Sequence, residues 1–169
     1  MKRVAIATIC VVTLVLGLGR AVAARAGAEV VTFPVNFTIT SAGCPNLPNG
    51  TTITGSGTEQ SINTTLERNG VITLINSSHA FGTATDQDGN TYVFDYSNES
   101  RGILSESGVI TGQMSDHFSL AGNGPARLTN GFIGDFTFDL ISLAFSLDPK
   151  HSFGDPIDFG TGLARCDPL

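Results

Sequence analysis

Apolar and polar side chains alternate along several segments of the chain, which is typical of a strand with one buried face. Between Phe33 and Ile39, apolar residues stand at every second position, with Asn36 and Thr38 among the polar residues between them. The same period recurs in residues 92–96 and, most regularly, in residues 132–140. Because an antiparallel sheet can bury one face and expose the other, this alternation predicts antiparallel strands.

Weaker alternation and turn residues extend this prediction along the chain. Further strands are predicted at 51–54, 59–66, 71–76, 80–85, 110–120 and 141–147, a loop at 55–57 and a short helical turn near 98–105. Five Asn-Gly or Asp-Gly pairs, which close hairpins at low cost, are Asn49-Gly50, Asn69-Gly70, Asp88-Gly89, Asn123-Gly124 and Asn130-Gly131. The pattern predicts an all-β fold: a single antiparallel β-barrel or β-sandwich of about eight to nine strands, rich in hairpins.

The apolar faces of the predicted strands define the expected core. Its aromatic members, which line either a packed interior or a ligand cavity, are Phe33, Phe37, Tyr92, Phe94, Tyr96, Phe132, Phe136 and Phe138. One small domain can hide several apolar faces only against one another, so we expect these faces to converge on one interior. An eight-stranded barrel holds one small ligand or fills with side chains, and composition does not distinguish these outcomes.

Residues 1–28 predict a secretory signal peptide. Met1, Lys2 and Arg3 form a short basic start, residues 4–18 are a nearly unbroken apolar run, and small residues with A-x-A spacing follow. An apolar run of this length before a cleavage zone favours export over a membrane span. We expect cleavage near Ala26 or Ala28 and a single β domain at 29–169, secreted to the extracellular space or held in the cell envelope.

Removal of the signal peptide changes the charge balance. The whole chain has a net charge of −6, and four of its nine basic residues lie in residues 1–28. The mature chain then keeps five basic residues against fifteen acidic ones, a net charge of −10. Such a field repels nucleic acids and anionic membrane surfaces, so we expect neither as a partner.

Cys44 and Cys166 are the two cysteines that follow the signal peptide. An even pair in an exported protein predicts a disulfide. Two free thiols or a metal-binding pair are the alternatives that the sequence leaves open. Two cysteines alone do not complete a zinc site, and no histidine stands at finger spacing from either.

Few residues are candidates for catalysis or metal binding. Asp116, His117 and Ser119 are the residue types of a hydrolase triad, but neighbours on a strand point to opposite faces, and no G-x-S-x-G motif is present. Residues 86–90 space oxygen ligands as a calcium loop does, yet they lack the Gly and Glu of an EF-hand, which favours a hairpin turn. We expect no catalytic residue, no metal ligand and no cofactor.

Other polar residues carry weaker signals. His79 is predicted to lie in a loop or at a strand entry, and Asp155 and Asp158 flank a short loop in which their carboxylates could converge. Five N-x-Ser/Thr acceptors are Asn36, Asn49, Asn63, Asn76 and Asn98. They matter only in a host that glycosylates such sites, and the signal peptide fits bacterial export equally well.

The stretches HAFGTATDQDGNTYVFDYSN and DHFSLAGNGP and the terminal ARCDPL resemble a loose group of small secreted β-rich proteins of actinobacterial type. The resemblance covers most of residues 29–169 and implies export and a β-rich fold. Its motifs are turn and strand patterns, and the group has no assigned activity, so it implies no functional residue. A more distant analogy to calycin-like or allene-oxide-cyclase-like barrels rests on strand number and Gly-rich hairpins.

Together these observations predict a secreted, non-catalytic β protein that binds a small apolar ligand or a surface partner. One alternative is a structural protein of the cell envelope or extracellular space. The other is a barrel-type cyclase or hydrolase, whose acid–base candidates would be Asp116, His117, Asp155 and Asp158. A cavity lined by Phe and Tyr would favour the ligand. A buried His or Asp beside a cleft would favour the enzyme, and a solid core with a featureless surface the structural role.

Overall fold

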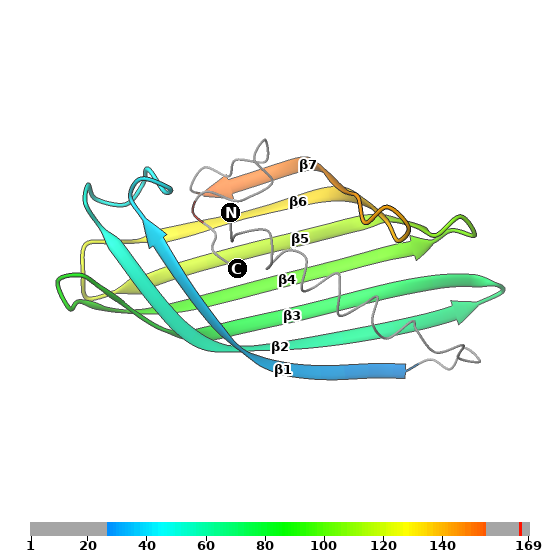
Figure 1. Ribbon diagram of the computed structural model, residues 1–169, viewed down its shortest axis with the longest axis horizontal. Helices are drawn as coiled ribbons and strands as arrows, with labels where there is room; N and C mark the ends of the chain where they lie inside the picture. The colour runs from blue at the N-terminus through cyan, green and yellow to red at the C-terminus, as the bar shows by residue number, and fades with distance from the viewer. Residues whose placement is uncertain (1–26, 155–165, 167–169) are drawn as a thin grey trace.

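The computed structural model describes residues 27–154 and Cys166. Seven antiparallel strands form one sheet, in which each strand pairs with the next along the chain (Figure 1). They are β1 (Gly27–Thr40), β2 (Thr52–Arg68), β3 (Val71–Asp86), β4 (Thr91–Leu104), β5 (Val109–Gly122), β6 (Leu128–Asp139) and β7 (Phe145–Gly154). The all-β prediction is confirmed. In the described residues, however, the sheet has seven strands in place of eight or nine, and it is not closed into a barrel.

The strands are longer than the sequence pattern predicts. Strand β2 contains residues 52–54 and 59–66 of two predicted strands, and the loop predicted between them is extended. The glycines in that stretch serve close packing, since a Cβ at Gly57 would lie 2.2 Å from the Phe81 carbonyl oxygen. Similarly, β3 unites the strands predicted at 71–76 and 80–85, and β4 includes most of the predicted helical turn.

Four of the five predicted turn pairs lie in connections between strands. Asn69 and Gly70 both have positive φ, 53° and 78°, and they form the two-residue link between β2 and β3, which is the preferred hairpin geometry. Asn130-Gly131 is the exception, because it lies inside β6. There the Asn130 side chain is fully buried, and a Cβ at Gly131 would lie 2.6 Å from the Asp116 carbonyl oxygen.

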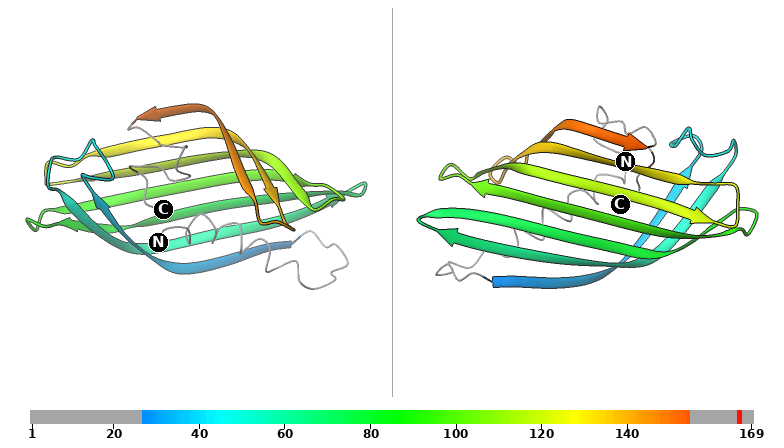
Figure 2. Two further views of the ribbon diagram at one scale, coloured as in Figure 1. Left: turned by 45° about the horizontal axis from the view of Figure 1, so that its top comes forward. Right: turned by 180° about the vertical axis from the view of Figure 1, so that it is seen from behind.

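The sheet is strongly curled, as the short distances between aromatic rings of β1, β4 and β5 show. The Phe37 ring of β1 lies 5.0 Å from that of Phe94 in β4 and 6.0 Å from that of Phe118 in β5, measured between centroids. Strands in a flat sheet are about 4.8 Å apart, so β1 and β5 would be separated by roughly 19 Å. The C-terminal half of β1 and the N-terminal half of β2 therefore bend over the strands that follow (Figures 1 and 2). We call the face that carries Phe37 the inner face and the opposite one the outer face.

Small residues on β2 and β3 make room for this curl. The inner face of these strands carries Gly55, Gly57, Ala80, Gly82 and Ala84. A Cβ at Gly55 would lie 2.2 Å from the Phe37 ring, and one at Gly82 would lie 2.2 Å from the Ser56 carbonyl oxygen and 2.7 Å from the Phe94 ring. The rings of β1 and β4 consequently pack directly on the backbone of β2 and β3.

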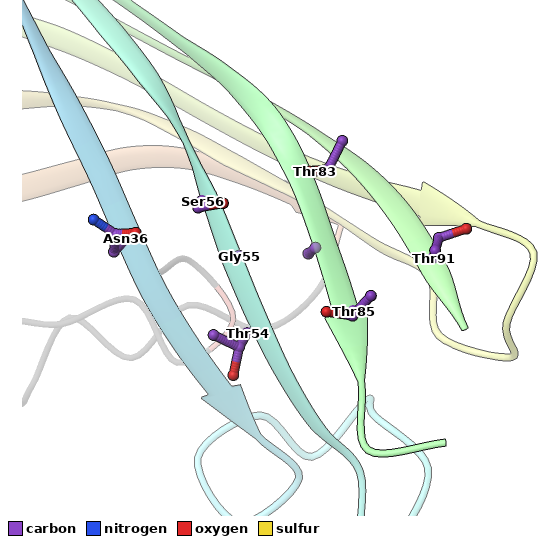
Figure 3. A pocket seen from close by; sticks show the side chains of 8 residues that line it. Asn36, Thr54, Gly55, Ser56, Thr83, Thr85 and Thr91 are labelled. Atoms are coloured by element: carbon purple, nitrogen blue, oxygen red, sulfur yellow. The ribbon is translucent and has the colours of Figure 1, made fainter. Parts of the chain in front are cut away.

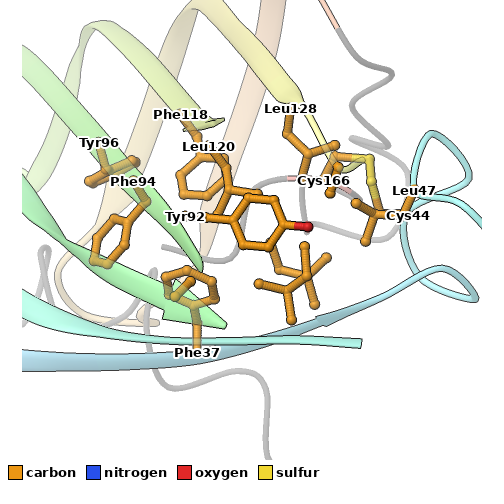
Figure 4. Close-up of a cluster of buried hydrophobic side chains, with 14 of the residues drawn as sticks. Phe37, Cys44, Leu47, Tyr92, Phe94, Tyr96, Phe118, Leu120, Leu128 and Cys166 are labelled. Atoms are coloured by element: carbon orange, nitrogen blue, oxygen red, sulfur yellow. A yellow bond between two sulfur atoms is a disulfide. The ribbon is translucent and has the colours of Figure 1, made fainter. Parts of the chain in front are cut away.

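The inner face holds two apolar clusters. The larger one, shown in part in Figure 4, consists of Val35, Phe37, Ile39, Cys44, Leu47, Ile53, Ala80, Ala84, Tyr92, Phe94, Tyr96, Phe118, Leu120, Ala126, Leu128 and Cys166, with Phe33 partly buried against it. The smaller one consists of Leu74, Ile110 and Phe138, with Ile72, Leu104, Phe136 and Leu140 packed against it. Phe132 is also buried. The expected convergence on one interior is therefore wrong, since Phe136 and Phe138 belong to a separate cluster.

A disulfide between Cys44 and Cys166 joins the β1–β2 connection to the C-terminal segment across 122 residues (Figure 4). Both cysteines and Leu47 are buried in the larger cluster, and the Asn130 side-chain amide donates a hydrogen bond of 2.8 Å to the Cys166 carbonyl oxygen. The predicted pairing is confirmed. A loop of this length reduces the entropy of the unfolded chain by an equivalent of about 4–5 kcal/mol.

The disulfide predicts that exported protein contains no free thiol. Mass spectrometry after alkylation without reductant should find Cys44 and Cys166 unmodified, and both modified after reduction in denaturant. The reduced protein should unfold at a lower temperature, because its unfolded chain regains the entropy that the cross-link removes. Two alkylated thiols before reduction would contradict the pairing.

The two clusters predict unequal costs for removing a Phe ring. Phe118→Ala should destabilise the protein by about 3–5 kcal/mol, because its ring is fully buried and leaves a cavity. Phe136→Ala should cost less than about 2 kcal/mol, since that ring is only partly buried and less apolar surface is lost. Asp135→Ala, on the outer face, should change stability by about 0.5 kcal/mol or less. Denaturant unfolding measures all three, and a cost at Asp135 equal to that at Phe118 would refute the face assignment.

Candidate functional site

A belt of polar side chains crosses the inner face beside the larger apolar cluster. Its buried members, which we call the polar belt, are Glu59, Ser61 and Asn63 of β2, Asn76 and Ser78 of β3, Asn98 of β4, Asp116 of β5 and Asn130 of β6. The strand register aligns them, because Ser61, Ser78, Asn98 and Asp116 are successive partners in one row across four strands. This row lies between the two clusters, whereas Asn130 pairs with Phe118 and Glu59 with Ala80, both of the larger cluster.

Several side chains of the belt bond to one another, as buried polar groups must to avoid a large desolvation cost. The Asn76 side-chain amide donates to Ser61 Oγ at 2.8 Å and to Asn63 Oδ1 at 2.9 Å. The Ser78 hydroxyl donates to Asn76 Oδ1 at 3.4 Å. Asn76 thus links both strands at the β2–β3 end of the belt.

Asp116 provides the carboxylate at the other end. Its Oδ2 accepts hydrogen bonds from the Tyr96 hydroxyl at 2.8 Å and from the Asn98 side-chain amide at 2.9 Å. The Tyr96 ring belongs to the larger apolar cluster, so this tyrosine spans the boundary between cluster and belt. The arrangement holds one oxygen of Asp116 in place and leaves the other uncommitted.

Among residues 27–154 and Cys166, three buried atoms of the belt find no hydrogen-bond partner: Asn63 Nδ2, Asp116 Oδ1 and Asn130 Oδ1. Two are acceptors and one is a donor. A buried polar atom without a partner costs about 1–3 kcal/mol, and more when the group is charged. Native proteins retain few such atoms, and each requires an explanation, such as a bound molecule or a functional role.

The sequence pattern does not reveal this belt. Tyr96 was predicted as a core residue, which the structure confirms. Asn98 was predicted near a helical turn, which is wrong because Asn98 lies within β4. Asn63, Asn76 and Asn98 are three of the five N-x-Ser/Thr acceptors, and all three are buried in the folded sheet, whereas Asn36 and Asn49 are exposed. One signal in the sequence could have revealed the belt: polar residues occupy some inward-facing positions of strands whose other inward-facing residues are apolar.

The structure separates the residues of the candidate triad. Asp116 faces the inner belt, whereas His117 lies on the outer face, where its ring stacks on Phe153 with centroids 5.9 Å apart. This agrees with the expectation that Asp116 and His117 do not meet. His79 lies inside β3, not in a loop or at a strand entry, and its Nε2 is 2.8 Å from Asp95 Oδ2 at the surface. Within residues 27–154 and Cys166, no group of three or more His, Cys, Asp or Glu is arranged to hold a metal ion.

Residues 86–90 form the β3–β4 turn, as predicted. Asp86 Oδ1 accepts the backbone N–H groups of Asp88 and Asn90, and Oδ2 accepts the Asn90 amide and the Tyr92 hydroxyl. The carboxylate is therefore occupied by its own hairpin. The hydrogen bond from the Asn90 side chain, helped by that from Tyr92 and opposed by desolvation, lowers the pKa of Asp86. Burial, and then the bond to Asp86, raise the pKa of the Tyr92 hydroxyl.

Two hollows open on the outer face. One, of about 390 Å³, is lined by Asn36 of β1 and by Thr and Ser side chains of β2 to β4, among them Thr54 and Thr83 (Figure 3). The other, of about 470 Å³, includes Glu99, Arg101 and Gln113 in its lining. Neither is lined by the Phe and Tyr residues of the predicted core, so neither is the aromatic cavity that the sequence analysis considered.

Asp155, Asp158 and residues 1–26 of the signal peptide predicted at 1–28 lie outside the described residues. In the part of the chain that is described, no helix is long and apolar enough to cross a membrane. No protein-family model matches the sequence, and no significant similarity to curated proteins or to solved structures is found.

The lowered pKa of Asp86 predicts a pH-dependent contribution to stability. A carboxyl group whose pKa is lower in the folded state stabilises the protein above its unfolded pKa of about 3.9, and this stabilisation is lost as the pH falls through the folded value. Wild-type protein should therefore be more stable than Asp86→Asn at pH 7, and the difference should shrink below about pH 4. Thermal unfolding between pH 2 and 7 measures it. Asp88→Asn, an exposed change in the same turn, is the control, and a gap that persisted unchanged at pH 2 would contradict the assignment.

Proposed function

We propose that this protein is an exported, non-catalytic binding protein whose inner sheet face receives a small amphipathic molecule. Because both hollows described above open on the outer face, binding requires the packed inner face to open. The apolar part of the ligand then lies against the aromatic cluster, and its polar group completes the hydrogen bonds of the polar belt. The observation that carries this proposal is the presence of three unpartnered polar atoms, on Asn63, Asp116 and Asn130, in a buried belt.

The unpartnered atoms define what the ligand must offer. Asp116 Oδ1 and Asn130 Oδ1 are acceptors, so they require donors, and Asn63 Nδ2 requires an acceptor. A molecule with an amide, or with a hydroxyl and an amine, carries both kinds of group. Because two of the three free atoms are acceptors and one belongs to a carboxylate, a neutral or cationic polar group fits better than an anion.

The surroundings of Asp116 account for the apolar part of the ligand. Phe118 lies two residues along the same strand and is fully buried in the larger cluster, and Met114 is partly buried on the other side. Tyr96 adds a ring whose hydroxyl already bonds to Asp116. A ligand polar group at Asp116 would thus be flanked by apolar side chains along the strand, an arrangement common in sites for small molecules.

Export agrees with the chemistry of the fold. The Cys44–Cys166 disulfide is compatible with an oxidising extracellular compartment. The net charge of −10 expected after removal of residues 1–28 disfavours nucleic acids and anionic surfaces as partners. A secreted protein that captures a neutral or cationic small molecule is consistent with both features.

The role of Asp116 Oδ1 in ligand binding is tested with N-phenyl-1-naphthylamine, a neutral fluorescent probe with an apolar body and one N–H donor. Exported wild-type protein should bind it saturably, with a rise in fluorescence. In Asp116→Asn, the amide oxygen would take the two donors from Tyr96 and Asn98 and so turn the NH₂ group toward the probe. A donor facing a donor should weaken binding at least tenfold, equivalent to about 1.4 kcal/mol.

Asp135→Asn is the matched control, because it removes the same charge from the neighbouring strand on the outer face. Its affinity for the probe should equal that of the wild type. Thermal unfolding of all three proteins identifies any loss of binding that comes from unfolding. Absence of saturable binding to wild-type protein, or equal affinity in Asp116→Asn, would refute the proposed site.

A further inference from the structure

The larger hollow of the outer face, of about 470 Å³, lies over strands β3 to β6 in the middle of the sheet (Figure 1). Its outward-facing residues occupy two neighbouring rows of the strand register, one with Ile75, Arg101 and Gln113 and the other with Ser77, Glu99, Ser115 and Ile133. Strand β4 thus contributes one cation and one anion to the same hollow. We call this site the charged hollow.

The opposite charges of Glu99 and Arg101 are not paired. The two residues are separated by one position on the same face of β4, which places their Cα atoms about 7 Å apart. Within residues 27–154 and Cys166, neither side chain makes an ion pair or a hydrogen bond. Both side chains are exposed, so they are free to turn toward a ligand in the hollow.

Other charged groups of the outer face already have partners. Asp95 Oδ2 lies 2.8 Å from His79 Nε2, and Asp135 Oδ2 lies 3.4 Å from Lys150 Nζ. Gln113 donates its side-chain amide to Asp135 Oδ1 at 3.2 Å, which leaves the Gln113 carbonyl oxygen available as an acceptor. These two acids are therefore engaged with their own neighbours, and the charges of the hollow are left for a ligand.

The charges of the hollow define the polar part of that ligand. The guanidinium of Arg101 binds a carboxylate through two parallel hydrogen bonds. Glu99 is flanked directly by Ser77 and Ser115, and together these side chains offer acceptors to an ammonium group. The acidic chain repels a ligand that carries only a carboxylate, whereas a zwitterion has no net charge. An amino acid carries both groups on one carbon, so it fits the two residues at once.

The edges of the hollow account for the apolar part of the ligand. Ile75 pairs with Arg101 across β3 and β4, and Ile133 pairs with Ser115 across β5 and β6. The Cβ atoms of such directly opposite residues are about 5 Å apart. Ile133 is 48% exposed, and an aliphatic ligand side chain would cover part of this surface. The volume is also within the range of about 300–1,000 Å³ that is usual for small-molecule sites.

A single unpaired charge on a protein surface is ordinary, but two of opposite sign in one hollow match a ligand that carries both charges. We propose that the charged hollow binds a zwitterionic amino acid with an aliphatic side chain, with the carboxylate of the ligand on Arg101 and its ammonium group on Glu99. This site lies on the face opposite to the polar belt, so the proposal does not depend on the ligand site of the inner face.

Titration with L-leucine, followed by the amide signals of the protein in NMR spectra, tests the ligand class. L-Leucine should bind the wild type saturably and shift the signals of Glu99, Arg101 and Gln113. N-acetyl-L-leucine lacks the ammonium group and L-leucinamide lacks the carboxylate, so each should bind at least about fivefold more weakly, equivalent to about 1 kcal/mol. No saturable binding of L-leucine, or equal affinity for either analogue, would overturn the proposal. Equal affinity for glycine would overturn the preference for an aliphatic side chain.

Two variants assign each group of the ligand to its residue. Arg101→Gln should bind L-leucine and L-leucinamide equally, because it no longer recognises the carboxylate. Glu99→Gln should bind L-leucine and N-acetyl-L-leucine equally, because it no longer recognises the ammonium group. Arg68→Gln and Glu106→Gln make the same changes at exposed residues near other hairpins, and both should bind L-leucine as the wild type does.

Thermal unfolding of each variant identifies any loss of binding that comes from unfolding, and the midpoints should stay unchanged because the replaced side chains are exposed. Asp116→Asn should bind L-leucine with wild-type affinity, since Asp116 faces the polar belt, so this site and the inner-face site can fail separately. Arg101→Gln and Glu99→Gln proteins that still discriminate as the wild type does, or an equal loss of affinity in the two control variants, would refute the charged hollow as the site.

Discussion

The contact of the Phe37 ring with the backbone at Gly55 is the constraint on which the rest of the structure depends. A side chain at Gly55 would occupy the space of that ring, and the ring reaches Phe94 and Phe118 only because the sheet bends over. The small residues of β2 and β3 therefore leave the space that the large rings of β1, β4 and β5 fill. This packing allows one curled sheet to bury an apolar cluster on its inner face, without a second layer in the described residues.

The curl also explains why polar side chains on the inner face affect stability. On an open, flat sheet, Ser61, Asn76 and Asp116 would be hydrated, and their unpaired atoms would carry little cost. On this inner face they are buried, so each hydrogen bond between them replaces one lost to water and each unpaired atom carries a cost. The polar belt thus places polar residues at buried positions where a core normally has apolar ones. Such exceptions are expected at functional sites.

Acidic residues serve a structural purpose at opposite ends of the sheet. Asp86 at the end of β3 and Asp139 at the end of β6 each accept two backbone N–H groups of the turn that follows. The Asn90 side-chain hydrogen bond lowers the pKa of Asp86, with smaller help from the Tyr92 hydroxyl and these backbone groups, whereas the backbone N–H groups of Ser142 and Ile141 chiefly lower the pKa of Asp139. Some of the carboxylates that make the protein acidic therefore also stabilise turns. Asp86 stabilises the polar β3–β4 hairpin, and Asp139 stabilises the exposed apolar β6–β7 connection.

The sequence by itself determined the period of the strands and the positions of most turns, and it favoured a disulfide between the two cysteines. These features depend on local rules: side chains alternate across a strand, Asn-Gly pairs accept positive φ, and an even pair of cysteines after a signal peptide favours a disulfide. Those rules also separated Asp116 from His117. Only the tertiary structure decided the conformation and role of residues that depend on neighbours distant in the sequence. Gly55, Gly57 and Asn130-Gly131 have the composition of loops and turns, yet they lie within strands, because rings and backbone from other strands occupy the space beside them. The polar belt is likewise formed by register, which brings Ser61, Ser78, Asn98 and Asp116 from four strands into one row that no single segment of the sequence contains.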